Sequence, residues 1–256
     1  ADCGLGTRSE VKNYIKKKQI TVNGIIVSKP DVKIDETNDI ICCKGEKVVY
    51  EKYVYYLFHK PAGCVTAKQD NLHKTVMDYF PETIAKEIAP VGRLDLNTEG
   101  LLLLTNDGAL THHLLSPTHH VAKTYYAILD KEVPQEAIVL FQKGIDIGDD
   151  TFTLPAELKI LPPKKSETII NLSHLDISNK RKLDSSEFMD YDKNQWIYSA
   201  ELTISEGRFH QVKRMFAAVG CKVLYLKRLS MGTLTLGDLE VGKYRKLSLE
   251  EIAKIK

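Results

Sequence analysis

One short stretch of the sequence gathers residues that could carry out chemistry. Residues 91–108 read VGRLDLNTEGLLLLTNDG and place Asp95 in a loop between Gly92 and Gly100. The apolar run Leu101–Leu104 is short enough for a buried strand, so Asp95 should lie at the mouth of a sheet. A carboxylate there can serve as nucleophile, general base or electrostatic stabiliser. It can equally be a turn residue that hydrogen-bonds its own backbone, and spacing alone does not decide between these roles.

A second stretch gathers cations. Residues 206–216 read EGRFHQVKRMF, and a helix is predicted over residues 209–219. Within about two helical turns this stretch places four basic side chains: Arg208, His210, Lys213 and Arg214. They either face a negatively charged ligand or form an ordinary solvated helix face.

Metal and nucleotide sites are not expected. The paired histidines of residues 112–120 lack H-x-x-x-H spacing, and neighbours on one element point in different directions. Neither G-x-x-x-x-G-K-[ST] nor G-x-G-x-x-G occurs, so the sequence shows no glycine-rich phosphate-binding motif for a nucleotide cofactor.

Composition narrows the class of protein. The 36 Lys and Arg residues nearly balance the 34 Asp and Glu residues. Basic residues crowd residues 8–18 and 208–214, so local fields rather than the total charge would attract a polyanion. Five cysteines without C-x-x-C spacing are typical of reduced thiols in a cytoplasmic protein. No apolar run approaches the ~20 residues that span a bilayer, and no sustained apolar stripe suggests an interface, so we expect a monomer without a membrane segment.

The first residues predict a small basic unit. Thr7 and Glu10 have the spacing of a capping box, so a helix should begin there. A hairpin should follow, because Asn23-Gly24 favours a type I′ turn between two short apolar runs. The helix carries a row of cations that either contact phosphates or form a solvated face: Arg8, Lys12 and Lys16. The chain begins at Ala1, and we expect the natural N-terminus to lie upstream.

The order of elements predicts an α+β fold in two domains. We expect residues 1–47 to form the small unit, residues 48–54 a linker, and residues 55–256 a larger domain. The larger domain should contain a mainly antiparallel mixed sheet flanked by helices. Apolar runs predict its strands near residues 55–58, 101–104, 125–129, 198–204, 223–226 and 234–236. Helices are predicted over residues 75–80, 109–115 and 209–219, and the polar residues 173–195 should form an excursion between strands.

These motifs together resemble a known family. GRLDLNTEGLLLLT is similar to the signature loop of the RsuA-type pseudouridine synthases, and TRSEVKNYIKKKQITVNG resembles the S4 RNA-binding module that precedes their catalytic domain. The resemblance covers nearly the whole chain except residues 173–195 and the start. It extends through KPAG, SPTHHVAKTYY, LTISEGRFHQVKRMFAAVG, LKRLSMGTLTL and GKYRKLSLEEI.

The resemblance implies roles for individual residues. Asp95 would be the essential aspartate, Tyr125 the tyrosine that stacks on the target base, and Lys213 the basic residue paired with the aspartate. Leu226 would lie beneath the base, and Arg93 would help fill the gap left by the flipped nucleotide. Two further residues of the family motifs would contact RNA or organise the site: Lys60 and Arg208.

The implied reaction converts a uridine of structured RNA to pseudouridine without a cofactor. The target base must leave its stack, and an aromatic platform offsets the lost stacking. The motifs look closest to the branch that modifies 16S small-subunit ribosomal RNA, so we expect that RNA, free or in an assembly particle, as partner. Two alternatives stay open: a paralogue acting on large-subunit RNA, and a non-catalytic RNA-binding assembly factor.

Overall fold

The chain divides into two compact units, Ala1–Val54 and Tyr55–Lys256. The computed structural model describes residues 3, 5–36, 38–48, 51–165 and 196–255. The predicted excursion over residues 173–195 therefore lies outside the described residues. No helix in the described ranges is long and apolar enough to cross a membrane.

The first unit packs one helix with a small antiparallel sheet. Thr7 caps α1 (Arg8–Lys16) in a capping box with Glu10, as the spacing predicts. The row Arg8, Lys12 and Lys16 is exposed. The sheet has the order β2-β1-β3-β4 and consists of β1 (Ile20–Val22), β2 (Ile25–Ile26), β3 (Ile41–Cys43) and β4 (Glu46–Lys47).

The predicted hairpin is confirmed. β1 and β2 pair antiparallel across Asn23-Gly24, and both residues of the turn have positive φ, 52° and 81°. These are the angles that a type I′ turn requires. β4 was not predicted, because two charged residues carry no apolar pattern of their own.

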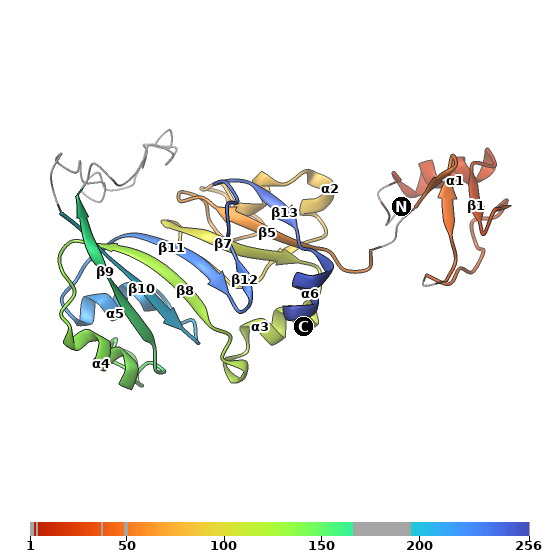
Figure 1. Ribbon diagram of the computed structural model, residues 1–256. Helices are drawn as coiled ribbons and strands as arrows, with labels where there is room; N and C mark the ends of the chain where they lie inside the picture. Colours follow the sequence, from red (N-terminus) through yellow and green to blue (C-terminus); the bar gives the residue numbers. More distant parts are fainter. Residues whose placement is uncertain (1–2, 4, 37, 49–50, 166–195, 256) are drawn as a thin grey trace. The chain divides into compact units, whose positions relative to one another are not determined.

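The second unit is built on one large mixed sheet, and the predicted fold class is confirmed. Its strand order is β13-β5-β7-β11-β8-β10-β9, with β12 on β11 and β6 on β7 (Figure 1). Every pairing among the described strands is antiparallel except that of β7 with β11. The strands are β5 (Tyr55–Lys60), β6 (Ala89–Pro90), β7 (Thr98–Thr105), β8 (Lys123–Leu129), β9 (Glu157–Lys165), β10 (Trp196–Ile204), β11 (Val223–Met231), β12 (Leu234–Thr235) and β13 (Tyr244–Lys246).

Helices cover this sheet in separate groups. The helices α4 and α5 lie together beside strands β8 to β10 (Figure 1), and the rings of Phe141 and Phe216 meet edge to face between them. The helical segments are η1 (Val76–Tyr79), α2 (Glu82–Ala85), α3 (Gly108–Leu115), η2 (Pro117–His119), α4 (Glu136–Lys143), α5 (Gln211–Ala218) and α6 (Leu249–Ile255).

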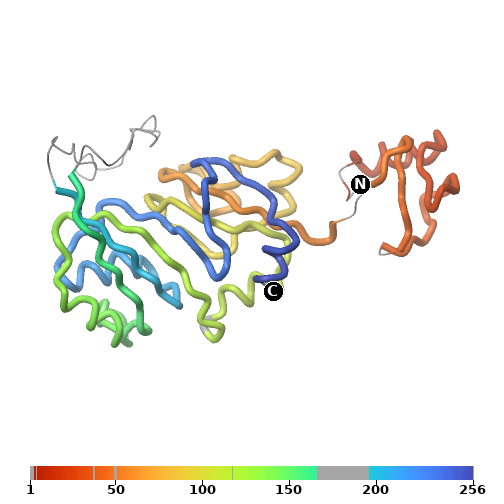
Figure 2. Tube along the Cα trace, viewed as in Figure 1, coloured from red at the N-terminus to blue at the C-terminus, as the bar shows by residue number. Residues whose placement is uncertain are grey.

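The continuous apolar run of β7 reflects its central place. All eight residues of the strand are buried, because both of its faces are covered. Leu101 and Leu103 join one core cluster with Tyr55 and Leu57. On one side β7 pairs with β5, and Figure 2 shows β5 beside β13, which comes from the opposite end of the unit.

Two predicted helices differ in detail from the structure. Of the helix predicted over residues 75–80, only Val76–Tyr79 is helical, as a short 3-10 helix. Thr75 and Asp78 cap its start, and Phe80 is extended. The helix predicted over residues 209–219 begins only at Gln211, because His210 adopts a left-handed conformation. Val219 is half-buried rather than part of the fully buried stripe.

The approach of β11 to β7 depends on Gly100. Its φ is +108°, and a Cβ atom would overlap the carbonyl oxygen of Arg228 and lie 2.6 Å from its amide nitrogen. We expect Gly100→Ala to lower the free energy of unfolding by more than about 3 kcal/mol, because both backbone strain and overlap oppose the side chain. Urea denaturation measures this. Gly108→Ala is the matched control, since nothing lies within 4 Å of its Cβ position, and equal losses in both variants would contradict the expectation.

Candidate active site

Hydrogen bonds from neighbouring segments fix the loop that carries Asp95. Thr66 Oγ1 donates to the carbonyl oxygen of Leu94 (2.8 Å) and accepts from the Leu94 amide (3.1 Å). The amide of Thr98, the first residue of β7, donates to the carbonyl oxygen of Asp95 (3.1 Å). The Asp95 side chain stays 30% exposed, so its carboxylate is accessible while its backbone is fixed.

Lys60 is the central support of this loop. The side chain lies at the end of β5 and is fully buried. Its Nζ donates to four carbonyl oxygens, those of Pro61 (2.9 Å), Asp95 (3.1 Å), Leu96 (3.3 Å) and Thr98 (2.9 Å). No part of the Lys60 side chain is exposed, so its polar contacts in this structure are with the backbone of the loop. Lys60 organises the loop, and burial lowers its pKa to about 8.

Two basic side chains of the 206–216 stretch face the Asp95 carboxylate. Lys213 Nζ lies 3.7 Å from Oδ2, and His210 Nε2 lies 3.6 Å from Oδ1. These distances are long for hydrogen bonds but within the range of an ion pair with a lysine. The carboxylate thus lies between the side chains of Lys213 and His210 and stays partly exposed to a ligand.

The start of α5 sets the direction of these side chains. His210 precedes the helix with φ 49° and ψ 31°. Gln211 closes the turn, because its Oε1 accepts from the Arg208 amide (2.9 Å) and its Nε2 donates to Glu206 Oε1 (2.8 Å). His210 and Lys213 are therefore presented three residues apart, as neighbours on one side of the helix start.

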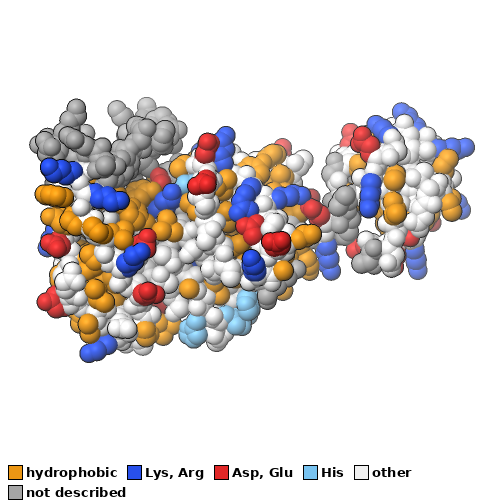
Figure 3. All heavy atoms as spheres, in the orientation of Figure 1, with side chains coloured by type: hydrophobic (Ala, Val, Ile, Leu, Met, Phe, Trp, Pro, Cys, Tyr) orange, Lys and Arg blue, Asp and Glu red, His pale blue; other side chains and the backbone are white. Residues whose placement is uncertain are grey.

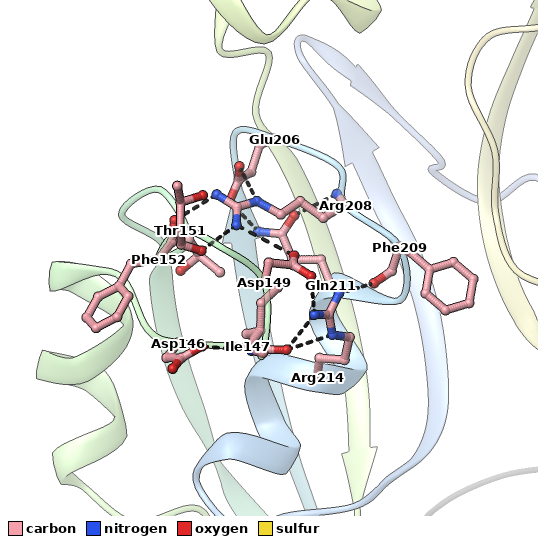
Figure 4. A network of polar contacts seen from close by, with 12 residues as sticks. Asp146, Ile147, Asp149, Thr151, Phe152, Glu206, Arg208, Phe209, Gln211 and Arg214 are labelled. Atoms are coloured by element: carbon pink, nitrogen blue, oxygen red, sulfur yellow. Dashed lines mark hydrogen bonds and ion pairs between the residues drawn. The ribbon is translucent and has the colours of Figure 1, made fainter.

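Two arginines join this helix start to residues 147–152 (Figure 4). Arg208 donates to Glu206 Oε2 through Nε (3.0 Å) and to the carbonyl oxygens of Thr151 and Phe152 through its two Nη atoms (both 2.7 Å). Arg214 donates to Asp149, to the carbonyl oxygen of Ile147 and to that of Phe209. Arg214 and then Arg208 lower the pKa of Asp149. We call this network the arginine clamp.

The hydrogen bonds of Arg208 within the arginine clamp are all with neighbouring protein groups. Its guanidinium contacts protein groups through all three nitrogen atoms, and the side chain is only 22% exposed. These contacts join the segment before α5 to residues 151 and 152.

Tyr125 and Leu226 lie on two neighbouring strands of the sheet, β8 and β11. Leu226 of β11 pairs with Ala127 on β8 and with Thr98 on β7, three residues after Asp95. Side chains alternate along a strand, so Tyr125 and Ala127 of β8 point to the same face. Leu226 lies opposite Ala127 and therefore shares that face of the sheet. Both are buried, at 8% and 4% exposure. Arg93, two residues before Asp95, is exposed.

A cleft of about 550 Å³ opens beside His210, Lys213 and Leu226, whereas Asp95 and Tyr125 are not among the residues that line it. It is lined by the turn after β5, by α5 and by the start of β11, including Ala62, Asn97, His210, Lys213, Lys222 and Leu226. Positive side chains outnumber the single lining carboxylate, Asp130. Such a cleft suits a polyanion, with an accessible carboxylate at hand for chemistry at a bound group.

His210 is the member of this site that the sequence analysis did not assign. It lies in the same motif as Lys213 and precedes it by three residues, and that spacing was the available signal. Of the other described histidines, His59 is buried, and the rings of His113 and His119 lie 4.1 Å apart. Figure 3 shows a group of histidine side chains together on the surface. Among the described residues no group of three His, Cys, Asp or Glu side chains could hold a metal ion.

The buried charge of Lys60 predicts a pH-dependent stability. An ordinary lysine has a pKa near 10.5, whereas that of Lys60 is lowered to about 8. Between these values the unfolded chain binds more protons, so the unfolding free energy of the wild type should rise with pH relative to Lys60→Met, by up to about 3 kcal/mol. Urea denaturation from pH 7.5 to 10 measures the difference. Lys86→Met, at an exposed position, should run parallel to the wild type, and a parallel course for Lys60→Met would contradict the argument.

Comparison with known proteins identifies the family. The family model for RNA pseudouridylate synthases matches residues 54–218. The chain is 37% identical to RNA pseudouridine synthase YtzG of Bacillus subtilis, over 98% of this chain and 94% of the relative. It is 37% identical to ribosomal small subunit pseudouridine synthase A of Pasteurella multocida, over 96% and 93%, and 34% identical to ribosomal large subunit pseudouridine synthase B of Bacillus subtilis, over 100% and 93%.

A solved structure agrees with these relatives. The crystal structure of a pseudouridylate synthase covers 100% of this chain and 96% of its own, at 35% identity and a TM-score of 0.64. The chain is therefore a member of the RsuA-type pseudouridine synthase family.

Proposed function

We propose that this enzyme isomerises a uridine in 16S small-subunit ribosomal RNA, with Asp95 as its catalytic carboxylate. The observation that carries the proposal is the pairing of Asp95 with Lys213 at an open, positively lined cleft. The lysine places a positive charge beside the carboxylate, and the cleft next to this pair could receive the sugar and base of a flipped nucleotide.

The reaction needs no net exchange with a cofactor. The C1′–N1 bond of the uridine breaks, the base rotates, and a C1′–C5 bond forms, while the hydrogen of C5 leaves to water and N1 gains a proton. Asp95 can serve by attack on C1′, by addition to C6 or by removal of the 2′ proton. In each route the same residue must reach the nucleotide, which the exposed carboxylate allows.

Other residues of the site would position the base. We assign Tyr125 to stacking on the target uracil and Leu226 to contact beneath it, since both lie on one face of the sheet and Leu226 lines the cleft. Arg93 is exposed near Asp95 and would occupy the space that the flipped nucleotide leaves in the RNA.

The relatives include enzymes named for the small subunit and one named for the large subunit. The small-subunit enzymes of Pasteurella multocida and Escherichia coli share 37% and 34% identity with this chain. The large-subunit enzyme of Bacillus subtilis shares 34% over the whole chain, and it makes large-subunit RNA the second candidate.

Residues 1–47 would act as an S4-type RNA-binding module, joined by residues 48–54 to the catalytic domain 55–256. The support is the exposed row of Arg8, Lys12 and Lys16 on a capped helix beside a hairpin. Such a row can neutralise successive phosphates of an RNA backbone.

Tritium release tests the catalytic proposal. We expect the wild type to release tritium from small-subunit ribosomal RNA labelled at uridine C5, and Asp95→Asn to fall to the level of RNA alone. Lys213→Met should lower kcat by about 100-fold, because it removes the electrostatic partner of the carboxylate. The exposed Asp238→Asn is the control and should keep full activity.

The same assay separates the alternatives. Release only from large-subunit RNA would reject the small-subunit target and keep the enzyme. An active Asp95→Asn variant would reject the catalytic role of Asp95. If the wild type released no tritium from either RNA or from assembling small-subunit particles, the result would favour an RNA-binding assembly factor.

Salt dependence tests the N-terminal module. Replacing Arg8, Lys12 and Lys16 by Gln should reduce the slope of log affinity against log salt concentration by about 2, because fewer counterions are released from the RNA. A triple variant with the same change in charge on exposed sites of the other unit, Lys86, Lys143 and Lys254, should keep the slope of the wild type. Equal slopes in the two triple variants would count against the module.

A further inference from the structure

Phe209 exposes a large aromatic ring at the edge of the active site. Its side chain is 76% exposed, more than that of any other aromatic residue among the described core and surface positions. The ring stacks on that of His210, with centroids 3.9 Å apart and planes inclined by 15°. Single exposed apolar side chains are common, so exposure alone does not mark a site.

The backbone under this ring is held in a defined conformation. The carbonyl oxygen of Phe209 accepts a hydrogen bond from Arg214 Nη1 (3.1 Å), and His210 adopts a left-handed conformation that a non-glycine residue rarely takes. Figure 4 shows the Phe209 ring turned outward at one side of the arginine clamp, with the ring of Phe152 turned outward at the other. The clamp thus fixes an aromatic ring in solvent, where it gains nothing from burial in the protein itself.

The place of the ring relative to Asp95 follows from its partner. His210 presents one face of its imidazole to Phe209 and its Nε2 to Asp95 Oδ1 at 3.6 Å. The ring therefore lies one side chain away from the carboxylate, beside a cleft lined by Lys213, Arg214 and Lys222. An aromatic face next to a positive groove is the combination that binds unstacked nucleotides.

We propose that Phe209, backed by His210, is a stacking platform for a nucleotide that flanks the target uridine. The inference rests on the proposed function and adds a second base-binding position to it. Extrusion of the target leaves its neighbours without one stacking partner, and the exposed ring offers a replacement that accepts any base. Tyr125 cannot fill this role as well, because it is buried in the sheet and assigned to the target base.

Tryptophan fluorescence tests for stacking at position 209, in a variant that is expected not to turn over the RNA. Trp196 is the only tryptophan of the chain, so Trp196→Phe removes the native signal and Phe209→Trp introduces a reporter. In an Asp95→Asn background, we expect 16S ribosomal RNA to quench the emission of Trp at position 209. The matched reporter is Phe152→Trp, since Phe152 is 65% exposed on the other side of the same clamp, and its emission should not change.

Substitutions then separate stacking from simple apolar contact. In the otherwise unmodified chain, Phe209→Ala and Phe209→Leu should weaken RNA binding by between about fivefold and 150-fold, the range of a lost base–aromatic stack. Phe209→Tyr should keep the affinity of the wild type, as should Phe152→Ala. Thermal unfolding should be unchanged in all four variants, because both rings are exposed.

The outcomes distinguish this inference from the proposed function. An unquenched reporter, or Phe209→Ala that binds RNA as the wild type does, would overturn the platform even if tritium release proceeds normally. Quenching together with weaker binding of Phe209→Ala would support the platform even if the wild type released no tritium, which would reject only the proposed reaction. Equal weakening by Phe209→Ala and Phe209→Tyr would also overturn it, since a tyrosine ring can stack.

Discussion

The structure of the site depends on one buried ammonium group. Lys60 Nζ is surrounded by four backbone carbonyl oxygens, two of which belong to Asp95 and Leu96. Removing a charge from water costs several kcal/mol, and aligned carbonyl dipoles offset much of that cost. The lowered pKa of Lys60 shows that the offset is incomplete. The chain thus holds a charge in its interior in order to fix the backbone of a loop that has no regular secondary structure.

The second half of the site is fixed in the opposite way, from the surface. The arginine clamp joins the start of α5 to residues 147–152. The position of that helix start sets the positions of His210 and Lys213. One buried cation therefore positions the carboxylate, and two partly exposed cations position its partners. The two supports share no residue, so the Asp95–Lys213 distance reports on both.

Some of this organisation was predictable from the sequence because its causes are local. The capping box at Thr7, the Asn23-Gly24 turn and the buried run of β7 each follow from neighbouring residues. The burial of Lys60 was not predictable, because its four acceptors come partly from residues more than thirty positions away. The helix α4 (EAIVLFQK) was missed, because its apolar residues are too continuous to show one face. The left-handed conformation of His210 depends on the clamp, and no short pattern indicates it.

The pairing of β13 with β5 sets the order in which the molecule can be completed during synthesis. β5 opens the second unit, whereas its neighbour β13 lies among the last residues of the chain. β7 likewise receives β11 only after residues 223–231 exist. A ribosome-bound fragment that ends before β11 would have the carboxylate and its loop but not the complete sheet. The candidate site is therefore completed near the end of translation, so a partly synthesised chain presents no finished site to the RNA around it.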